Sequence, residues 1–338
     1  MDKVIRVAVD AMGGDLAPVE PIKGAVAAMN EEKRVVCVFY GKKEVIEEEL
    51  SKYTYDKNQV EIVDCREVIE MGESPVLAIR SKKDSSIVKA MLDVHDGKCD
   101  SYLSAGSTGA NLVGAQVLVG RLKGIERPPL APLIPTSNGP KLIIDCGANV
   151  DAKPSYLVQY AMMGSIYMKH MMGIDNPKVG LLNIGTEEEK GNALVKETFP
   201  LLKSLPEINF IGSVEARDIP AGVCDVIVCD AFAGNLILKM YEGVGKTLLS
   251  EVKSTLMSNI KTKLGAALIK KELKKTLIKY DMHQYGSAPL LGLTGLVCKT
   301  HGSATSAEFR NSILEAVEFA DKDVNGKIKE WLSGRAEI

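Results

Sequence analysis

Short apolar runs recur along the chain and alternate with stretches of helical periodicity. The runs are rich in Val, Ile and Leu, and they occupy residues 4–9, 35–39, 60–63, 101–104, 141–144, 179–184 and 226–228. Continuous apolar runs of this length are typical of strands that are buried on both faces. Their alternation with helices predicts an α/β fold with a mostly parallel sheet and helices on both of its faces.

Polar and glycine-rich segments follow five of these predicted strands. They occupy residues 10–15, 104–111, 145–149, 183–191 and 229–235. In open α/β sheets, ligands bind outside the carboxyl ends of the strands. The sequence therefore predicts that the chemistry is located at this edge of the sheet.

The segment after the fourth run has the features of an anion site. Glycine lets backbone N–H groups approach an anion closely, and a helix N-terminus carries a partial positive charge. We expect phosphate at Ser107, Thr108 and Gly109. An ordinary tight turn is the alternative for any one such loop, but five of them at one sheet edge favour a site. His301 is also a candidate because it lies at a junction before a helix, whereas Lys190, after three glutamates, also fits a solvated turn.

Several common motifs are absent from the sequence. There is no G-x-x-x-x-G-K-[ST], no G-x-G-x-x-G after the first predicted strand and no G-x-S-x-G, which argues against P-loop, common dinucleotide and nucleophile-elbow chemistry. The seven cysteines include no C-x-x-C pair. We expect reduced, buried thiols and neither a zinc site nor another metal site.

Composition and charge narrow the class of protein further. The net charge of −2 over 338 residues argues against a basic nucleic-acid-binding protein. The N-terminal residues lack the apolar stretch of a signal peptide, and the uncharged run 101–120 contains too many glycines and amides for a membrane span. We therefore expect a cytosolic protein. Residues 1–338 are predicted to form a single α/β unit, and a division into two lobes that cross near 128–140, around the Pro-rich stretch 127–135, stays open.

Two basic clusters are candidates for contact with an acidic partner protein. They comprise Arg80, Lys82 and Lys83, and Arg121, Lys123 and Arg127. Such clusters are usually solvated faces, but they also steer acidic partners.

Residues 250–282 differ from the rest of the chain and predict a basic amphipathic helical hairpin. The segment 251–280 carries eight lysines and two glutamates, a net charge of +6. Apolar residues recur at helical spacing, with Leu273 and Leu277 in the second half. Gly265 is the expected break between the two helices. The apolar stripe predicts contact either with a membrane surface or with a protein. The residues proposed to face a membrane are Leu273, Leu277, Lys270, Lys271, Lys274 and Lys275.

Taken in order, the motifs resemble one family, the bacterial phosphate acyltransferases (acyl-ACP:phosphate transacylases) of phospholipid synthesis. The matching segments are 9–15, 82–86, 104–110, 145–149, 180–191, 230–235 and 286–292, which span almost the whole chain. One departure is Ala231, where the family pattern has glycine. Because alanine tolerates a positive φ poorly, we expect a slightly different turn there.

The resemblance implies a fold, a reaction and partners. The fold would be a three-layer α/β/α architecture similar to phosphate acetyltransferases and isocitrate/isopropylmalate dehydrogenases. A homodimer without metal or redox cofactor would convert acyl-ACP and inorganic phosphate to acyl phosphate and acyl carrier protein. A membrane-bound glycerol-3-phosphate acyltransferase would then use the product, so we expect peripheral association with the inner face of the membrane.

The resemblance also suggests roles for individual residues. Phosphate would be held by the loops, by the hydroxyls of Ser107 and Thr108, and by positive charge from Lys190 or His301. Asn149 or Asn235 would stabilise the oxyanion. The remaining candidates would orient these groups or bind substrate: Asp10, Asp15 and Asp230, with Gly13, Gly14, Gly109 and Gly234.

Three alternatives stay open. They are a phosphate acetyltransferase-like enzyme that uses acyl-CoA, a metal-dependent dehydrogenase of similar fold, and a non-catalytic scaffold of lipid synthesis. The dehydrogenase would need a carboxylate cluster for Mg²⁺ or Mn²⁺ and arginines for its substrate. Arginine is sparse at the strand ends, which disfavours that alternative.

Overall fold

The computed structural model describes residues 3–334, except for the side chains of residues 282 and 283. The chain divides into two compact units, and each is described here by itself. The first unit contains the chain up to Pro132, Ile166–Ile174 and the chain from His283 onward. The second unit contains Leu133–Ser165 and Asp175–Met282. The first crossing point, after Pro132, falls inside the Pro-rich stretch.

A six-stranded sheet forms the centre of the first unit, in the order β10-β11-β4-β1-β2-β3. The strands are β1 (Ile5–Asp10), β2 (Val35–Gly41), β3 (Val60–Asp64), β4 (Ser101–Ser104), β10 (Ala288–Leu290) and β11 (Leu296–Lys299). All neighbours are parallel except β10 and β11. The carboxyl ends of β1, β4 and β11 therefore lie together, and the loops after them meet.

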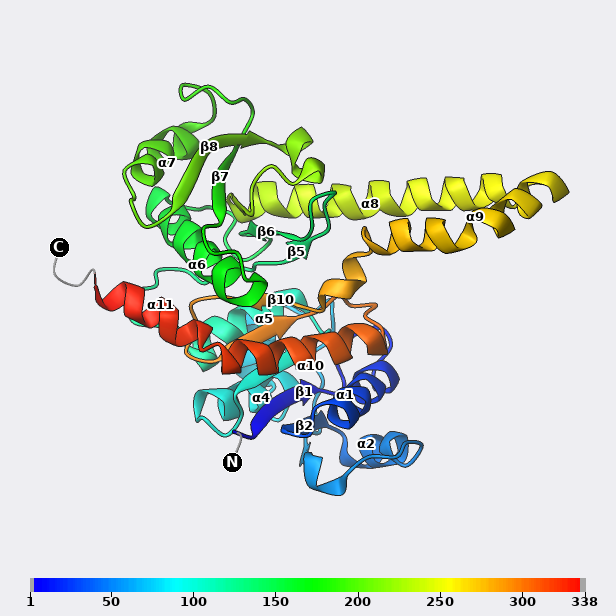
Figure 1. Ribbon diagram of the computed structural model, residues 1–338. Coiled ribbons are helices and arrows are strands. Elements are labelled where there is room, and N and C mark those ends of the chain that lie inside the picture. Colours follow the sequence, from blue (N-terminus) through cyan, green and yellow to red (C-terminus); the bar gives the residue numbers. More distant parts are fainter. Residues whose placement is uncertain (1–2, 335–338) are drawn as a thin grey trace. The chain divides into compact units, whose positions relative to one another are not determined.

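Helices cover this sheet and shape its packing (Figure 1). They are α1 (Val19–Glu31), α2 (Lys43–Leu50), α3 (Pro75–Ser81), α4 (Ser86–His95), α5 (Thr108–Gly114), α10 (Ser306–Asp321) and α11 (Val324–Ser333), with short helices η1 (Lys57–Gln59) and η2 (Ala115–Val119). Helices α1 and α10 pack closely. A Cβ on Gly24 would lie 2.5 Å from the Cβ of Phe309, so glycine is what permits this approach.

The second unit contains a five-stranded sheet in the order β5-β6-β9-β7-β8. Its strands are β5 (Leu133–Ile134), β6 (Lys141–Ile144), β7 (Lys178–Asn183), β8 (Asn209–Glu215) and β9 (Val226–Val228). Only β5 pairs antiparallel. The helices are α7 (Ala193–Lys203), α8 (Ala231–Leu256), α9 (Ile260–Ile278), η3 (Ala216–Ala221) and most of α6 (Pro154–Met172), which continues into the first unit; η4 (Met282–Tyr285) also spans a crossing point.

Helices α8 and α9 form a hairpin that extends from the second unit's sheet (Figure 1). The two helices are separated at residues 257–259, and Asn259 begins α9 with a capping box that includes Thr262. The predicted break at Gly265 is wrong, since Gly265 lies inside α9. An Asn side chain at the N-cap stabilises the start of a helix by accepting hydrogen bonds from its free N–H groups. This effect is stronger than the tendency of an interior glycine to end a helix.

The predicted α/β class with mostly parallel strands and helices on both sides is confirmed. All seven predicted strands are present, but they belong to two sheets. Four further strands escaped prediction: β5, β8, β10 and β11. Strands β5 and β10 are very short, and β8 is interrupted by polar residues and by Gly212. Neither pattern nor length therefore indicates these three strands. Between residues 3 and 334, no helix is both long and apolar enough to cross a membrane.

Candidate functional site

The loops after β1 and β4 are joined through the side chain of Asp10. Val9 of β1 lies opposite Leu103 of β4, so both loops start at the same level. The Ser104 hydroxyl donates to Asp10 Oδ2 at 2.7 Å and accepts the Gly106 N–H at 2.9 Å. The Met12 N–H donates to Asp10 Oδ1 at 3.1 Å. Burial raises the pKa of Asp10, partly opposed by hydroxyls of Ser86 and Ser104 and by loop N–H groups.

Glycines at positions 13 and 14 allow the first loop to lie directly on the second. A Cβ on Gly13 would lie 2.3 Å from Asp10 Oδ2 and 2.8 Å from the Gly106 nitrogen. Gly14 has a φ of 101°, which side chains rarely adopt. The next residue, Asp15, is exposed, and its N–H donates to the Gly302 carbonyl at 2.7 Å. The loop after β11 is thereby joined to the first loop.

The predicted phosphate segment begins helix α5. The Ser107 hydroxyl is buried and accepts the Ala110 N–H at 3.4 Å, so it caps the helix. The Thr108 side chain is exposed. A Cβ on Gly109 would lie 2.5 Å from Pro75 Cγ, which places α3 directly against this segment. Thr108 is therefore the more accessible hydroxyl of the two.

The end of β11 and the loop after it supply two basic side chains in different environments. His301 is exposed, and its Nδ1 lies 2.8 Å from Ser303 Oγ. Lys299 is only 8% exposed, and its Nζ donates to the Ala105 carbonyl at 3.4 Å and to the Thr300 carbonyl. Sequence reasoning missed Lys299. Its only signal is a lysine that ends an apolar run at a strand end.

In the second unit, a buried carboxylate organises the loop after β6. Asp145 Oδ1 accepts the Ala148 N–H at 3.0 Å, and Oδ2 accepts the Asn149 N–H at 2.9 Å and its Nδ2 at 2.8 Å. A Cβ on Gly234 would lie 1.9 Å from the Asp145 carbonyl oxygen. Only glycine therefore lets the first turn of α8 pack on this loop. Asp145 itself was not predicted as a site residue.

Asp230 begins helix α8 and caps it. Its Oδ1 accepts the Ala233 N–H at 2.8 Å, and the Ala231 N–H donates to the Asn149 carbonyl at 3.1 Å. Ala231 is the first residue of the helix and does not have a positive φ. The turn at this position therefore does not require a positive φ of Ala231. Asn235 is exposed in the first turn.

Lys190 lies in the loop after β7 and is exposed. Its Nζ forms an ion pair with Glu187 Oε1 at 2.7 Å, and this hydrogen bond raises the pKa of Lys190. The Lys190 carbonyl accepts Nδ2 of the buried Asn183 at 3.1 Å. Asn183 was not predicted, although an asparagine directly after an apolar run could have indicated it.

The structure thus brings most of the predicted residues together in two groups, whereas Lys190 contacts Glu187 and Asn183 and belongs to neither. In the first unit, contacts connect the loop of Asp10, Gly13, Gly14 and Asp15 with the segment 104–109 and the loop of His301. In the second unit, contacts connect Asn149, Asp230 and Gly234, with Asn235 on the same helical turn. Within residues 3–334 no group of three or more His, Cys, Asp and Glu side chains could hold a metal ion.

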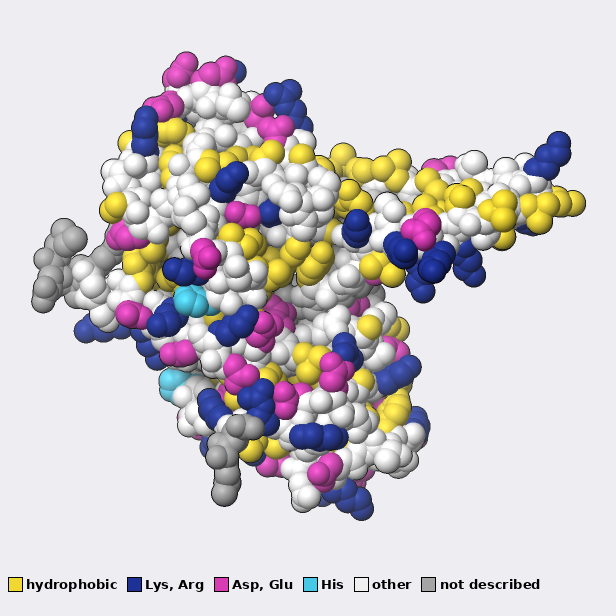
Figure 2. Space-filling model, viewed as in Figure 1, with side chains coloured by type: hydrophobic (Ala, Val, Ile, Leu, Met, Phe, Trp, Pro, Cys, Tyr) yellow, Lys and Arg dark blue, Asp and Glu magenta, His cyan; other side chains and the backbone are white. Residues whose placement is uncertain are grey.

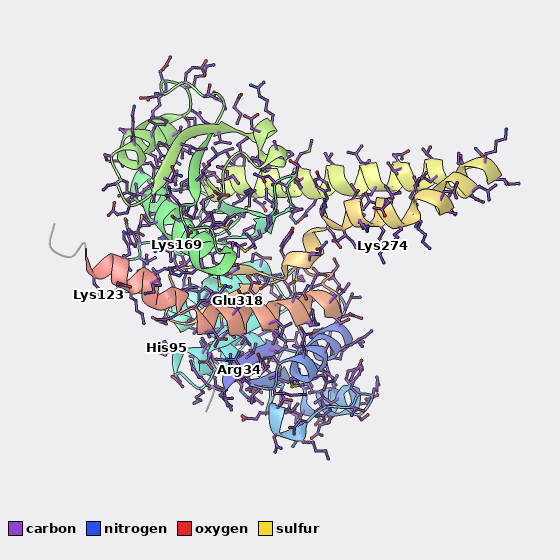
Figure 3. The ribbon with its side chains drawn as sticks, viewed as in Figure 1. Arg34, His95, Lys123, Lys169, Lys274 and Glu318 are labelled. Carbon is purple, nitrogen blue, oxygen red and sulfur yellow. The ribbon has the colours of Figure 1, made fainter. Side chains whose placement is uncertain are left out.

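The basic residues proposed for partner docking are engaged to different extents. Lys82 is paired with Glu73 at 2.5 Å, and Lys83 donates to the Ile79 carbonyl at 3.1 Å. Arg121 donates to the Glu126 carbonyl. The Arg127 guanidinium donates to Gln116 Oε1 at 3.2 Å. Among these six described residues, Arg80 and Lys123 are exposed and have no side-chain hydrogen bond or ion pair, so their charges are the most available to a partner. Lys123 is marked in Figure 3.

The apolar side chains of the hairpin differ in exposure. Leu273 and Leu277 of α9 are half-buried. Leu268 is 88% exposed, Ile260 78% and Leu264 64%. Figure 2 shows hydrophobic side chains at the free end of the hairpin and lysines beside them; Lys274 is marked in Figure 3. The most accessible apolar surface of α9 is therefore in its first half.

The chain matches the family model described as "Fatty acid synthesis protein" over residues 5–327. The chain belongs to this family. A phosphate acyltransferase from Clostridium perfringens is 49% identical over 332 residues, which cover 98% of both chains. One from Clostridium novyi is 47% identical over 97% of this chain and 98% of the relative. This family member is thus similar, over nearly its full length, to relatives that are named phosphate acyltransferase.

Solved structures support the fold of this family member. A phosphotransacetylase from Streptococcus pyogenes aligns with a TM-score of 0.61 and 17% identity, covering 94% of both chains. A branched-chain phosphotransacylase from Enterococcus faecalis aligns with a TM-score of 0.56 and 15% identity, covering 93% of this chain and 98% of that one. At these identities the likeness shows a shared fold, as the resemblance implied.

Proposed function

We propose that this protein transfers an acyl group from acyl carrier protein to inorganic phosphate, giving acyl phosphate and free carrier protein for phospholipid synthesis. The observation that carries the proposal is the 49% identity, over 98% of both chains, to a protein named phosphate acyltransferase. The phosphotransacetylase-like fold supports it, because exchange of an acyl group between a thioester and phosphate is the same class of acyl-transfer chemistry.

In the proposed reaction, a phosphate oxygen attacks the thioester carbonyl carbon directly. The C–O bond forms, the C–S bond breaks, and the thiolate leaves on the carrier protein. An acyl-cysteine intermediate is disfavoured, since burial raises the pKa of Cys146 and of Cys229 well above its ordinary value. A neutral buried thiol is a poor nucleophile. No metal is required by this scheme, because the thiolate is already a good leaving group.

We propose the following roles for the candidate residues. Phosphate would bind at Thr108, Ser107 and Gly109, and His301 or Lys190 would add positive charge. Asn149 or Asn235 would donate to the developing oxyanion, an interaction that typically contributes about 3–4 kcal/mol per donor. Asp230 would act by fixing the start of α8, and Asp15 by fixing the loop after β11.

The activity is tested by incubating the protein with phosphate and either palmitoyl-ACP or palmitoyl-CoA. We expect acyl phosphate, trapped as the hydroxamate, and free carrier protein from the first donor. Preference for the CoA thioester would favour the phosphate acetyltransferase-like alternative, and no product from either donor would favour a scaffold. Thr108→Val should raise the KM for phosphate. The matched control is Thr54→Val, because Thr54 is an exposed threonine of the same unit that lies outside the glycine-rich loops.

We further propose that the two basic clusters dock the acidic carrier protein. The exposed positions Arg80 and Lys123 offer the clearest test, because neither requires breaking an ion pair with another side chain. Arg80→Glu with Lys123→Glu should raise the KM for acyl-ACP, flatten its salt dependence and leave the KM for acyl-CoA unchanged. Lys42→Glu with Lys57→Glu, two exposed reversals elsewhere in the unit that change the net charge by the same amount, is the control. Equal effects on both donors would exclude docking.

We propose that the hairpin of α8 and α9 associates with the inner face of the membrane, near the membrane-bound acyltransferase that would use the product. Its exposed apolar side chains, together with lysines such as Lys270, Lys271, Lys274 and Lys275, support reversible binding to anionic lipid. Leu264→Glu with Leu268→Glu should abolish co-sedimentation with anionic vesicles and leave acyl transfer in solution intact. The half-buried pair Leu273 and Leu277, changed to alanine, is the comparison. Failure of the wild-type protein to co-sediment at low salt would contradict the proposal.

A homodimer is proposed on the basis of helix α8. Its exposed apolar side chains include Leu236, Met240, Leu248 and Val252, and a contiguous exposed apolar surface marks an interaction site. Sedimentation equilibrium should give twice the chain mass for the wild-type protein. Met240→Glu with Leu248→Glu should give a single chain mass; a monomeric wild-type protein would contradict the proposal.

A further inference from the structure

Four buried polar side chains of the first unit form one continuous hydrogen-bonded chain, here termed the Asp10 network. Tyr102 OH donates to Asn111 Oδ1 at 2.7 Å, and Asn111 Nδ2 lies 3.4 Å from Ser104 Oγ. Ser104 Oγ in turn donates to Asp10 Oδ2 at 2.7 Å. None of the four is more than 1% exposed. The network therefore runs from β4, through α5, to the end of β1.

Each part of the network that lies near the loops also fixes a backbone group of a loop. Asp10 accepts the Met12 N–H in the first loop. Ser104 accepts the Gly106 N–H, and Asn111 Nδ2 donates to the Ser107 carbonyl at 2.9 Å in the second loop. These bonds set the positions of both glycine-rich loops relative to one another. A shift in any side chain of the network would move a loop peptide.

Packing reinforces this connection. A Cβ on Gly13 would lie 2.3 Å from Asp10 Oδ2 and 2.9 Å from Ser104 Oγ, so the first loop lies directly on the network. Burying four polar side chains costs free energy unless all are paired. Apolar residues would fill the same volume without the free-energy cost of burying polar groups. A fully paired polar chain at this place is therefore better suited to fixing loop geometry than to adding stability.

We propose that Tyr102, Asn111, Ser104 and Asp10 act together as positioning residues that hold the two glycine-rich loops in the arrangement that binds inorganic phosphate. This inference rests on the proposed function for the identity of the ligand. It assigns Asp10 no contact with substrate, since its carboxylate is buried and occupied by loop N–H groups and the Ser104 hydroxyl. The effect of the network on phosphate is transmitted through the backbone at residues 105–109.

The decisive comparison is between two tyrosines of the same unit. Tyr102 and Tyr40 are both fully buried, and each hydroxyl donates to a side-chain oxygen at 2.7 Å, in Tyr40 to Asp93 Oδ2. Tyr102→Phe and Tyr40→Phe each remove one hydrogen bond of a buried hydroxyl, to a neutral amide in Tyr102 and to a carboxylate in Tyr40, so Tyr40→Phe should lower thermal stability at least as much as Tyr102→Phe does. Only Tyr102→Phe should raise the KM for phosphate, by roughly fivefold to tenfold, with the KM for the acyl donor unchanged.

A second variant keeps the volume of the side chain. Asn111→Asp places a carboxylate oxygen opposite the Ser107 carbonyl, where Nδ2 now donates. Two acceptors then face each other, so Asn111→Asp should raise the KM for phosphate more than Tyr102→Phe does. Hydrogen exchange should be faster at residues 11–14 and 105–109 in both variants and unchanged in Tyr40→Phe.

The outcomes separate this inference from the proposed function. Equal increases in the KM for phosphate in Tyr102→Phe and Tyr40→Phe, or parallel increases for both substrates, would overturn the positioning role. If the wild-type protein forms no acyl phosphate, the proposed function fails. The exchange experiment then still decides whether the network fixes both loops, because unchanged exchange at 11–14 and 105–109 in the variants overturns the inference without any activity measurement.

Discussion

Replacement of Glu315 by glutamine should change how stability depends on pH. Glu315 lies on α10, and the buried Tyr167 hydroxyl donates to its Oε1 at 2.6 Å. Burial raises the pKa of Glu315 from 4.5 to about 7, although the hydrogen bond from Tyr167 acts in the opposite direction. Glutamine retains the shape and an acceptor for Tyr167 but cannot ionise.

The magnitude follows from the difference between the folded and unfolded pKa values. An increase from 4.5 to about 7 corresponds to about 3 kcal/mol, at ~1.4 kcal/mol per pKa unit. Between these values the folded protein binds more protons at Glu315 than the unfolded chain does. The contribution of Glu315 to the free energy of unfolding therefore falls as the pH rises from about 4.5 to about 7, and it is constant above that range.

The assay is urea unfolding of wild-type protein and Glu315→Gln at pH 5 and pH 8. The variant should gain stability relative to wild-type protein as the pH rises, by up to about 3 kcal/mol. Glu318→Gln is the control, because Glu318 is an exposed carboxylate on the same helix (Figure 3) that pairs with Lys322. A stability difference between wild-type protein and Glu315→Gln that is constant with pH, or that changes in the opposite direction, would refute the assignment of a buried, protonated carboxyl.

Three further predictions concern packing in the second unit. Gly234→Ala should prevent stable folding of this unit or cost more than about 4 kcal/mol, measured by thermal unfolding, because its Cβ would lie 1.9 Å from the Asp145 carbonyl oxygen. Gly265→Ala should instead stabilise the protein by roughly 0.5–1 kcal/mol, since Gly265 is inside α9 with nothing within 4 Å of its Cβ; a loss of stability would show that the helix is not formed there. Lys141→Met should cost about 3–5 kcal/mol in urea unfolding, as it leaves the buried Asp225 carboxylate without its partner at 2.7 Å, and a double variant with Asp225→Asn should recover much of that loss.

Seven strands could be predicted from the sequence because burial on both faces favours apolar side chains along the whole element. Runs such as 35–39 and 226–228 show this pattern without reference to the rest of the chain. Glycine and polar residues after them locate the loops for a similarly local reason, because only some residues permit close approach and sharp turns. The resemblance adds family and reaction, since the order of these loops is itself a property of the sequence.

Other features depend on which distant residues meet, and only the tertiary structure decided them. Asp10 and Ser107 look like ligands in the sequence, but the fold buries both. Asn111 is an ordinary helical residue until Tyr102 and Ser104 are placed beside it. Lys299 becomes a candidate only because β11 pairs with β4.

The division into two sheets has the same origin. Apolar runs indicate that strands exist, but pairing is set by backbone hydrogen bonds between segments far apart in sequence. Strand β8 illustrates this. Its polar residues and Gly212 do not form a local strand pattern, but they are compatible with its position at the edge of the sheet beside β7. The sequence by itself therefore determined seven of the strands, the loops that follow them and the family resemblance, because these depend on the type and order of residues along the chain. The tertiary structure decided which loop side chains are buried, paired or exposed, because burial is a property of the whole packed chain.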